Sequence, residues 1–354
     1  MSSALESGFR GRVVRLGGDR LSVRWQPRTL VVCGVLLALT VVVGVLSLST
    51  GDYPVPLSGV VDSLLGRGTS AESFIVVSLR LPRLTAGLLI GAALGMSGSV
   101  FQSLSRNPLG SPDIIGFTSG AAAGAVVEIT VHHGGQNQVA AAALAGGLIT
   151  ALVVYLLSLK GGRVAGYRLV LVGIGVSAVL TSVTSYLLTR ASLYDAQSAA
   201  VWLVGSLNGL GWNVVTPLAI ALLVLTPVVV AAGRTLGWIE MGDDAAKSLG
   251  VPVERTRLLL VVVGTALAAA ATAAAGPIAF VALAAPQLCR RLTRSSGALV
   301  VPSAFMGALL LCSSDFAAQR VIPSTELPVG IATGVIGGAY LCWLLSHVWR
   351  TGRS

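Results

Sequence analysis

Charged side chains that could bind a partner gather in one segment, residues 234–257, which has long apolar runs on both sides. The sequence predicts a short helix in the middle of this segment, beginning at Gly242 or Asp243 and ending at Gly250. We expect Ala245, Ala246 and Leu249 to give this helix a small apolar face. Two interpretations follow, a helix lying on a membrane surface or a helix that fits a pocket on another protein. The segment is neutral overall, because it contains four acids and four bases: Glu240, Asp243, Asp244, Glu254, Arg234, Lys247, Arg255 and Arg257.

Few other residues have the types and spacing that chemistry requires. Neither of the two lysines, Lys160 and Lys247, follows a glycine, so the chain has no Walker A loop for a nucleotide. The four cysteines stand singly in apolar stretches, which is not a disulfide or metal-binding pattern. His132 and His133 are adjacent but have no further ligands in their loop. We therefore expect no catalytic residue, bound metal or cofactor in this chain, and any ATP and Mg to be bound by a partner.

The composition of the chain indicates which elements must position these residues. Hydrophobic residues make up 54% of its 354 residues and charged residues 11%, against about 25% in soluble domains. Long continuous apolar runs favour helices over a barrel, so we predict an all-α integral membrane protein. We expect a membrane domain over 30–349, between an arginine-rich arm at 1–29 and a tail at 350–354, with a short interfacial helix near 196–209. About ten spans are predicted, at 30–50, 82–105, 113–131, 139–159, 168–190, 212–233, 257–275, 277–293, 300–318 and 326–347.

The distribution of positive charge predicts the orientation of these spans. With the N-terminus in the cytoplasm, few of the 24 lysine and arginine residues fall on the outer side, namely Arg67, Arg80, Arg83, Arg190 and Arg320. This asymmetry follows the positive-inside rule, which places both termini and segment 234–257 in the cytoplasm. The same distribution explains the net charge of +10 by contact with membrane lipid, so we expect no nucleic acid partner.

Two motifs flank the second predicted span. Residues 79–83, Leu-Arg-Leu-Pro-Arg, open it from the outer side, and Pro82 suits the first turn of a helix. Arg80 and Arg83 there either anchor lipid phosphates or bind an acidic extracellular partner. At the inner end, a turn with two prolines follows Gln102, and then a glycine-ridged helix.

These motifs resemble the permease subunits of iron-siderophore, haem and vitamin B12 ABC importers, the FecCD family. The resemblance covers residues 30–349, and it rests on five stretches in family order: Arg80-Leu-Pro-Arg83, Gln102-x4-Asn107-Pro108-Leu109, Met241 to Gly250, Gly276-Pro-Ile-Ala-Phe-Val-Ala-Leu283 and Glu326-Leu-Pro-Val-Gly330.

The resemblance implies a type II ABC importer fold, like the vitamin B12 importer permease, in the cytoplasmic membrane of a bacterium. It also implies a second permease chain, two cytoplasmic ATPase subunits and an extracytoplasmic binding lipoprotein. The residues that match the binding-protein docking positions are Arg80, Arg83 and Arg320. Those that match the inner mouth of the pathway are Gln102, Asn107, Pro108 and Leu109. Those that match the ATPase-coupling helices are Glu240, Met241, Gly242, Asp243, Asp244, Ala245, Ala246, Lys247, Ser248, Leu249 and Gly250.

Departures from the family pattern refine this expectation. Pro286-Gln287 replaces the commoner Pro-His, and Arg320 is shifted by one position relative to Asp315. These features are similar to the second permease of a ferric-enterobactin-type system, which favours a heterodimer and a ferric siderophore. Haem and vitamin B12 are the alternatives within the family. A stand-alone secondary transporter would work without an ATPase, but the scarcity of acids within the spans argues against it.

Overall fold

The computed structural model describes residues 12–16, 21–160, 163–164, 166–295, 297–321 and 327–351. Within these ranges, β1 (Arg12–Leu16) pairs antiparallel with β2 (Leu21–Trp25), and β3 (Leu159–Lys160) pairs with β4 (Arg163–Val164). Much of the predicted arm, most of the predicted tail and the motif residue Glu326 lie outside the described residues.

Helices account for the rest of the regular structure described. Seven of them are long and apolar enough to cross a membrane, and a helix lies in every predicted span. The chain is an all-α integral membrane protein. Its helices are α1 (Pro27–Ser49), α2 (Leu57–Leu64), α3 (Ser70–Ser73), η2 (Phe74–Arg80), α4 (Leu81–Ser105), α5 (Pro112–Ile115), α6 (Phe117–Val127), η3 (Glu128–His132), α7 (Gln136–Ser158), α8 (Gly166–Arg190), α9 (Leu193–Val204), α10 (Trp212–Glu240), α11 (Asp243–Ser248), α12 (Val253–Ala275), α13 (Val281–Thr293), α14 (Val300–Val321) and α15 (Val329–Thr351).

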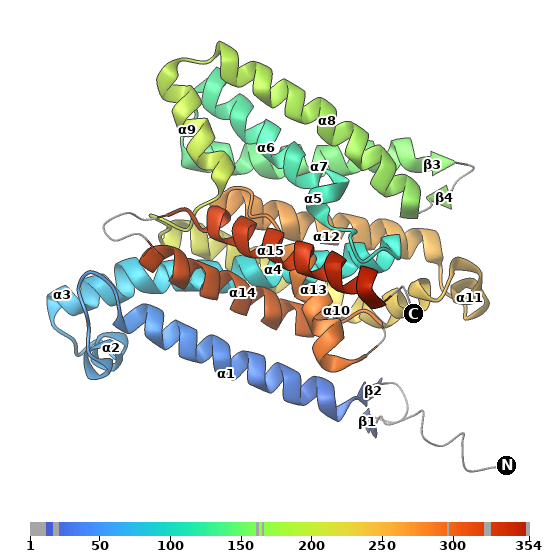
Figure 1. Ribbon diagram of the computed structural model, residues 1–354, viewed down its shortest axis with the longest axis horizontal. Coiled ribbons are helices and arrows are strands. Elements are labelled where there is room, and N and C mark those ends of the chain that lie inside the picture. Colours follow the sequence, from blue (N-terminus) through green and yellow to red (C-terminus); the bar gives the residue numbers. More distant parts are fainter. Residues whose placement is uncertain are drawn as a thin grey trace.

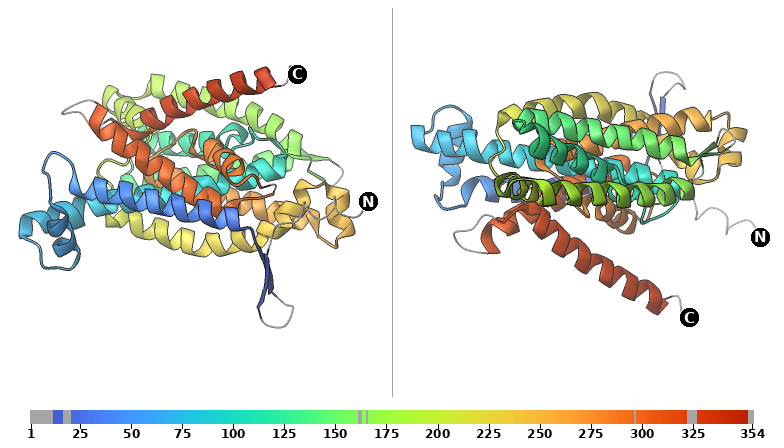
Figure 2. Two further views of the ribbon diagram at one scale, coloured as in Figure 1. Left: turned by 60° about the horizontal axis from the view of Figure 1, so that its bottom comes forward. Right: turned by 90° about the horizontal axis from the view of Figure 1, so that it is seen from above.

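Helix α4 lies at the centre of the bundle and packs against α10, α12, α13 and α14 (Figure 1). Helices α6, α7, α8 and α9 form a second group beside it, joined to the centre where α7 packs on α12. The main apolar core runs along α4, α10 and α12. Helix α15 diverges from the bundle toward its C-terminal end (Figure 2).

Two ridges of small residues, one on α4 and one on α6, bring helices into close contact. A Cβ at Gly91 or Gly95 would overlap the backbone of Gly307 or Ser303, so α4 and α14 approach at a distance that only glycine allows. The ridge on α6 packs in the same way against α7. By contrast, a Cβ at Gly334 or Gly338 of α15 would meet no atom of the described chain within 4 Å.

Pro82 lies in the first turn of α4, as predicted, but α4 does not open the helical stretch to which it belongs. A continuous helical stretch runs from Ser70 to Ser105, and Pro82 lies inside it. The π-helix η2 immediately precedes the proline, and the N–H of Leu81 donates to the carbonyl of Val76, five residues earlier. A π-turn there accommodates a residue that has no N–H and whose ring would clash with a regular helical turn.

Two predicted boundaries also differ from the structure. Span 113–131 is divided at Gly116, whose φ of +94° lies in the left-handed region that glycine tolerates, so that α5 ends there before α6 begins. The polar segment 234–257 is mostly helix that continues its neighbours: α10 extends to Glu240, and α12 begins at Val253. Only the residues between these two helices form a separate unit.

Candidate functional site

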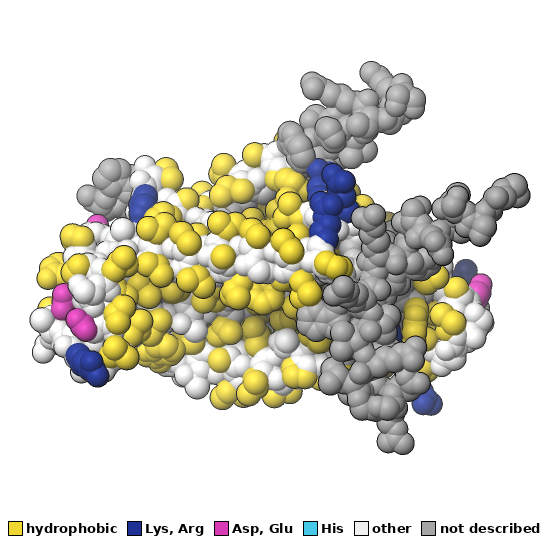
Figure 3. Space-filling view, turned by 90° about the horizontal axis from the view of Figure 1, so that it is seen from below, with side chains coloured by type: hydrophobic (Ala, Val, Ile, Leu, Met, Phe, Trp, Pro, Cys, Tyr) yellow, Lys and Arg dark blue, Asp and Glu magenta, His cyan; other side chains and the backbone are white. Residues whose placement is uncertain are grey.

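Polar and charged side chains gather at the two opposite ends of the bundle. Helices α2 and α3 mark one end and α11 marks the other (Figure 1). On the face shown in Figure 3, hydrophobic side chains cover the middle, and charged side chains lie toward both ends. This arrangement suits a protein whose apolar middle lies in the hydrocarbon core of a membrane and whose two ends contact water.

Helix α11 confirms the predicted short helix, with one correction to its apolar face. It spans Asp243–Ser248, and Gly242 (φ +126°) and Gly250 (φ +81°) lie on either side of it. Ala246 is 0% exposed and belongs to the core of this chain, so at this residue the predicted apolar face packs on the bundle and is not available to a partner. The apolar side chains that do point outward are Met241, at 71% exposure, and Leu249, at 57%.

The carboxylate of Asp243 joins α11 to two other elements. Arg257 on α12 donates from one guanidinium nitrogen to both carboxylate oxygens, at 2.9 and 3.0 Å, and is itself buried. Arg106, which ends α4 in the left-handed conformation, donates to the same carboxylate and from Nε to the carbonyl of Ile239 at 3.1 Å. The other terminal nitrogen of Arg257 donates to Oε1 of Glu254 at 3.3 Å.

These contacts also set the acidity of Asp243. Burial by itself would raise the pKa of this carboxyl, but the hydrogen bonds and charge of Arg257, followed by those of Arg106, outweigh it. The pKa is therefore lowered from its ordinary value of 3.8. Asp243 is ionised at neutral pH, so the contacts with both arginines are charge-assisted.

A second pair holds the end of α10 to α13. Arg290 donates to Oε1 of Glu240 at 2.9 Å and to Oγ of Ser103, on α4, at 3.4 Å. Glu240 is the first residue of the predicted coupling segment. Its contact with Arg290 means that both Glu240 and Asp243 are anchored to the membrane bundle.

The predicted inner-mouth residues form a hydrogen-bonded turn after α4. Gln102 is buried and donates to the carbonyl of Leu283 at 3.0 Å, while its own amide oxygen accepts from Gln287 at 2.8 Å. Gln287 also donates to the carbonyl of Pro108 at 2.9 Å. The side chain of Asn107 accepts from the N–H of Leu109 at 2.9 Å, which closes the turn. The turn is thus tied to α13 at the same end of the bundle as α11.

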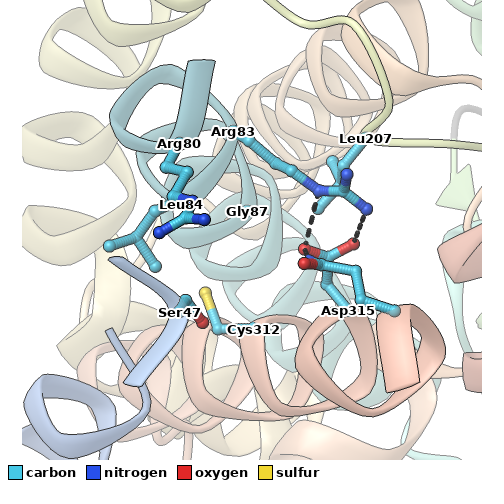
Figure 4. Close-up of a pocket in the computed structure, with 9 residues that line it drawn as sticks. Ser47, Arg80, Arg83, Leu84, Gly87, Leu207, Cys312 and Asp315 are labelled. Atoms are coloured by element: carbon cyan, nitrogen blue, oxygen red, sulfur yellow. Dashed lines mark hydrogen bonds and ion pairs between the residues drawn. The ribbon is translucent and has the colours of Figure 1, made fainter. Parts of the chain in front are cut away.

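At the opposite end, Arg80 and Arg83 lie on the same helical stretch and line a small pocket (Figure 4). Arg80 donates to the carbonyls of Leu48 and Tyr53, at 2.7 and 2.6 Å, and so fixes the loop that follows α1. Its charge lies close to the surface but its hydrogen bonds are directed into the chain.

Arg83 is engaged in an internal ion pair. Its Nε and one terminal nitrogen donate to the two carboxylate oxygens of Asp315 on α14, at 3.0 and 2.9 Å (Figure 4). Gln319, one turn along α14, donates to the same carboxylate at 2.7 Å. The side chains of Arg83 and Asp315 are only 15% and 9% exposed. The pair joins the two helices that the glycine ridge brings together.

Arg320, the third predicted docking residue, comes from α14 to the same end. It donates to the carbonyl of Phe316 at 2.8 Å and to Oγ1 of Thr50, and its guanidinium lies 3.5 Å from the centroid of the Phe316 ring. The three predicted docking arginines therefore share one end of the molecule, although each of them also donates hydrogen bonds within the chain.

Sequence reasoning did not identify the partners of these arginines. Asp315 stands in a long apolar run, where an acid usually has a basic partner, and Arg83 near the end of another run is its natural counterpart. Likewise, Arg257 and Arg290 bind Asp243 and Glu240. They lie 14 and 50 residues from these acids along the chain, and no local pattern in a single sequence reveals pairs at these spacings.

The two adjacent histidines do not converge on a metal site. Nδ1 of His132 lies 3.1 Å from Glu128, and Nδ1 of His133 lies 3.4 Å from Asp195, so they face different carboxylates. No cluster of three or more potential metal ligands occurs among the described residues.

The sequence matches the FecCD transport family over residues 39–347. It is 42% identical to the ferric enterobactin transport system permease protein of Escherichia coli (strain K12), in an alignment that covers 90% of this chain and 96% of that protein. It is 34% identical to the iron(3+)-hydroxamate import system permease protein of Bacillus subtilis (strain 168), over 90% and 97% of the two chains. A cobalamin import system permease protein of Halobacterium salinarum is 38% identical, over 77% and 73%.

Among solved structures, the fold is similar to that of a metal-chelate type ABC transporter in an inward-facing conformation. The TM-score is 0.80 and the sequence identity 26%, and the superposition covers 90% of this chain and 99% of that one.

Proposed function

The chain belongs to the FecCD transport family, and on that premise we propose that it is the membrane-spanning permease subunit of an ATP-driven importer of ferric siderophores. Its partners in this proposal are two cytoplasmic ATPase subunits, an extracytoplasmic binding lipoprotein and a second permease chain. ATP and Mg bind to the ATPase subunits. No reaction is catalysed by the permease itself.

The observation that carries the proposal is the short helix α11 between two glycines. Two exposed apolar side chains, Met241 and Leu249, flank this helix, while its acid Asp243 is bound to the bundle. Exposed apolar groups surrounded by the charges of Asp244 and Lys247 suit a pocket on a protein. A lipid-bound helix at an inner membrane surface would instead present lysines and arginines toward the bilayer. The coupling residues 240–250 therefore fit the ATPase.

Arg80, Arg83 and Arg320 define the docking end for the binding protein. Their positions at the end opposite to α11 support this assignment. Because Arg83 is occupied by Asp315, we propose that Arg80 and Arg320 offer the accessible positive charge, and that Arg83 shapes the surface beneath them. In this orientation α11, both termini and the Gln102–Leu109 turn lie in the cytoplasm.

The divergent helix α15 supports a second permease chain as partner. Gly334 and Gly338 lie one turn apart on a surface that the described chain leaves open, as small residues do where another helix approaches closely. The motif departures at Gln287 and Arg320 favour a different permease chain over a second copy. The tagged chain would be co-expressed with the ATPase and with either an untagged copy of itself or a different permease chain. The permease that co-purifies through the tag would identify the dimer.

Reconstitution tests both the mechanism and the substrate. The complete complex in proteoliposomes, with ATP enclosed and the binding lipoprotein outside, should accumulate a ferric tricatecholate or trihydroxamate chelate. Haem and cobalamin are tested in the same proteoliposomes, and ATP-dependent accumulation of either one in place of the ferric chelate would identify it as the substrate. Uptake of a chelate by the permease alone, without ATPase, would contradict the proposal.

A further inference from the structure

We infer that Arg106 and Arg257 clamp Asp243 so that α11 moves as one body with α4 and α12, which makes these three side chains positioning residues for the transmission of ATPase motion. The inference rests on the proposed function and names the contacts through which that function operates. We call Arg106, Asp243 and Arg257 the charge clamp.

The need for a clamp follows from the size and joints of α11. The helix has six residues, and helices so short are not stable alone. Gly242 and Gly250, at positive φ, form pliable joints on either side of it. A partner that pushes on α11 would bend these joints, and the packing of Ala246 alone would have to carry the movement to the bundle, unless a polar contact crosses the joints as well.

The charge clamp supplies such a contact. Asp243 is the first residue of α11, and its carboxylate accepts from Arg106, at the end of α4, and from Arg257, in the first turns of α12. Arg106 also holds the carbonyl of Ile239, on the far side of Gly242. The contact therefore spans the pliable joint and reaches two elements at once.

The path continues from Arg106 to the inner turn. Arg106 is followed directly by Asn107 and Pro108, and the carbonyl of Pro108 is held by Gln287 of α13. Displacement of α11 would be transmitted through Arg106 to the backbone of this turn. Arg106 and Asp243 are 43% and 34% exposed, and an ion pair exposed to this degree adds only about 1 kcal/mol or less of net stability, so its value here is the fixed geometry.

The test compares two clamp variants with a matched control. Arg106→Asn removes the guanidinium with a residue that accepts the left-handed conformation, and Asp243→Asn removes the carboxylate charge. Lys160→Asn removes an exposed positive charge from the same end of the protein and serves as the control. Each is assembled with its ATPase and binding protein, and the number of chelates imported per ATP hydrolysed is measured.

We expect each clamp variant to retain its ATPase subunits but to import at least about fivefold fewer chelates per ATP than the control. The double variant should be no worse than the poorer single variant, because both remove the same contact. Ratios equal to that of Lys160→Asn, or losses that multiply in the double variant, would overturn the inference.

Hydrogen exchange on the purified full-length permease gives a second readout that needs no ATPase. Amides of residues 241–250 should exchange faster in Arg106→Asn than in Lys160→Asn, and equal rates would overturn the clamp. If Arg106→Asn does not accumulate in the membrane, Arg106→Gln, which also removes the positive charge, replaces it under the same criterion. A wild-type complex that imports nothing would refute the proposed function, while the exchange rates would still decide on the clamp.

Discussion

The ion pair between Arg83 and Asp315 yields a prediction that separates docking from folding. We expect Arg83→Gln to destabilise the permease itself, because it leaves the carboxylate of Asp315 without its cation at a site where both side chains are largely buried. Removal of one partner from a buried pair costs about 3–5 kcal/mol. Gln319 still donates to Asp315, and Arg83 is partly exposed, so the lower limit of about 3 kcal/mol applies here.

A double-mutant cycle measures this quantity. The free energy of unfolding in mixed detergent is determined for Arg83→Gln, Asp315→Asn and the double variant. The sum of the losses of unfolding free energy in the two single variants should exceed the loss in the double variant by about 1–3 kcal/mol, the interaction energy expected of contacting charges. Arg67→Gln removes an exposed arginine near the same end and should change stability by less than about 0.5 kcal/mol.

A different outcome would refute this reasoning. If Arg83→Gln unfolds like the wild-type protein but binds the binding lipoprotein more weakly, Arg83 acts by docking and the pair with Asp315 carries no stability. For this reason, loss of uptake in an Arg83→Glu variant does not by itself identify a docking residue. Stability must be measured beside affinity.

Three further predictions follow from the packing and charges of the same regions. Ala246→Asp should destabilise the permease, since Ala246 is buried, whereas Leu249→Asp should weaken ATPase co-purification at unchanged melting temperature. Folding lowers the pKa of Asp243, so its contribution to stability is present above the unfolded pKa near 4 and is lost as the pH falls through the lower pKa of the folded state. Asp243→Asn should therefore make the free energy of unfolding depend less on pH on the acid side. Gly91→Ala should cost about 1–3 kcal/mol in unfolding free energy by overlap with Gly307, and Gly34→Ala, which meets no atom within 4 Å, should not.

The order of the spans could be predicted because the length of an apolar run reports directly on membrane thickness. Each predicted span contains a helix, and the helix between Gly242 and Gly250 was placed correctly from its flanking glycines and proline. The glycine ridge on α4 was also informative, since Gly91 and Gly95 have few other uses in a membrane helix.

The direction in which a side chain points could not be predicted in the same way. Soluble helices reveal their buried face by alternating apolar and polar residues, but a membrane helix is apolar toward both lipid and protein. Ala246 lies outside the spans, in a helix of six residues, which is too short for a pattern to show which of its apolar residues are buried. Asp315 lies 232 residues from its partner Arg83. Asp243 lies 137 residues from Arg106 and 14 residues from Arg257, and a local pattern does not encode such pairs.

Helix α4 connects the two ends on which the proposed function depends. Arg83 lies in its first turn, and Arg106 follows its last residue, so 25 residues of one helix, about 37 Å long, separate the docking end from the charge clamp. The glycine contacts with α14 and the buried pair with Asp315 fix this helix laterally. A helix held in this way responds to a push at Arg106 by shifting or tilting as a rod, because bending would break contacts along its length. Movement of α11 under the ATPase should therefore reach the surface beneath the binding protein through α4, and the same connection would carry the arrival of a loaded binding protein back to α11.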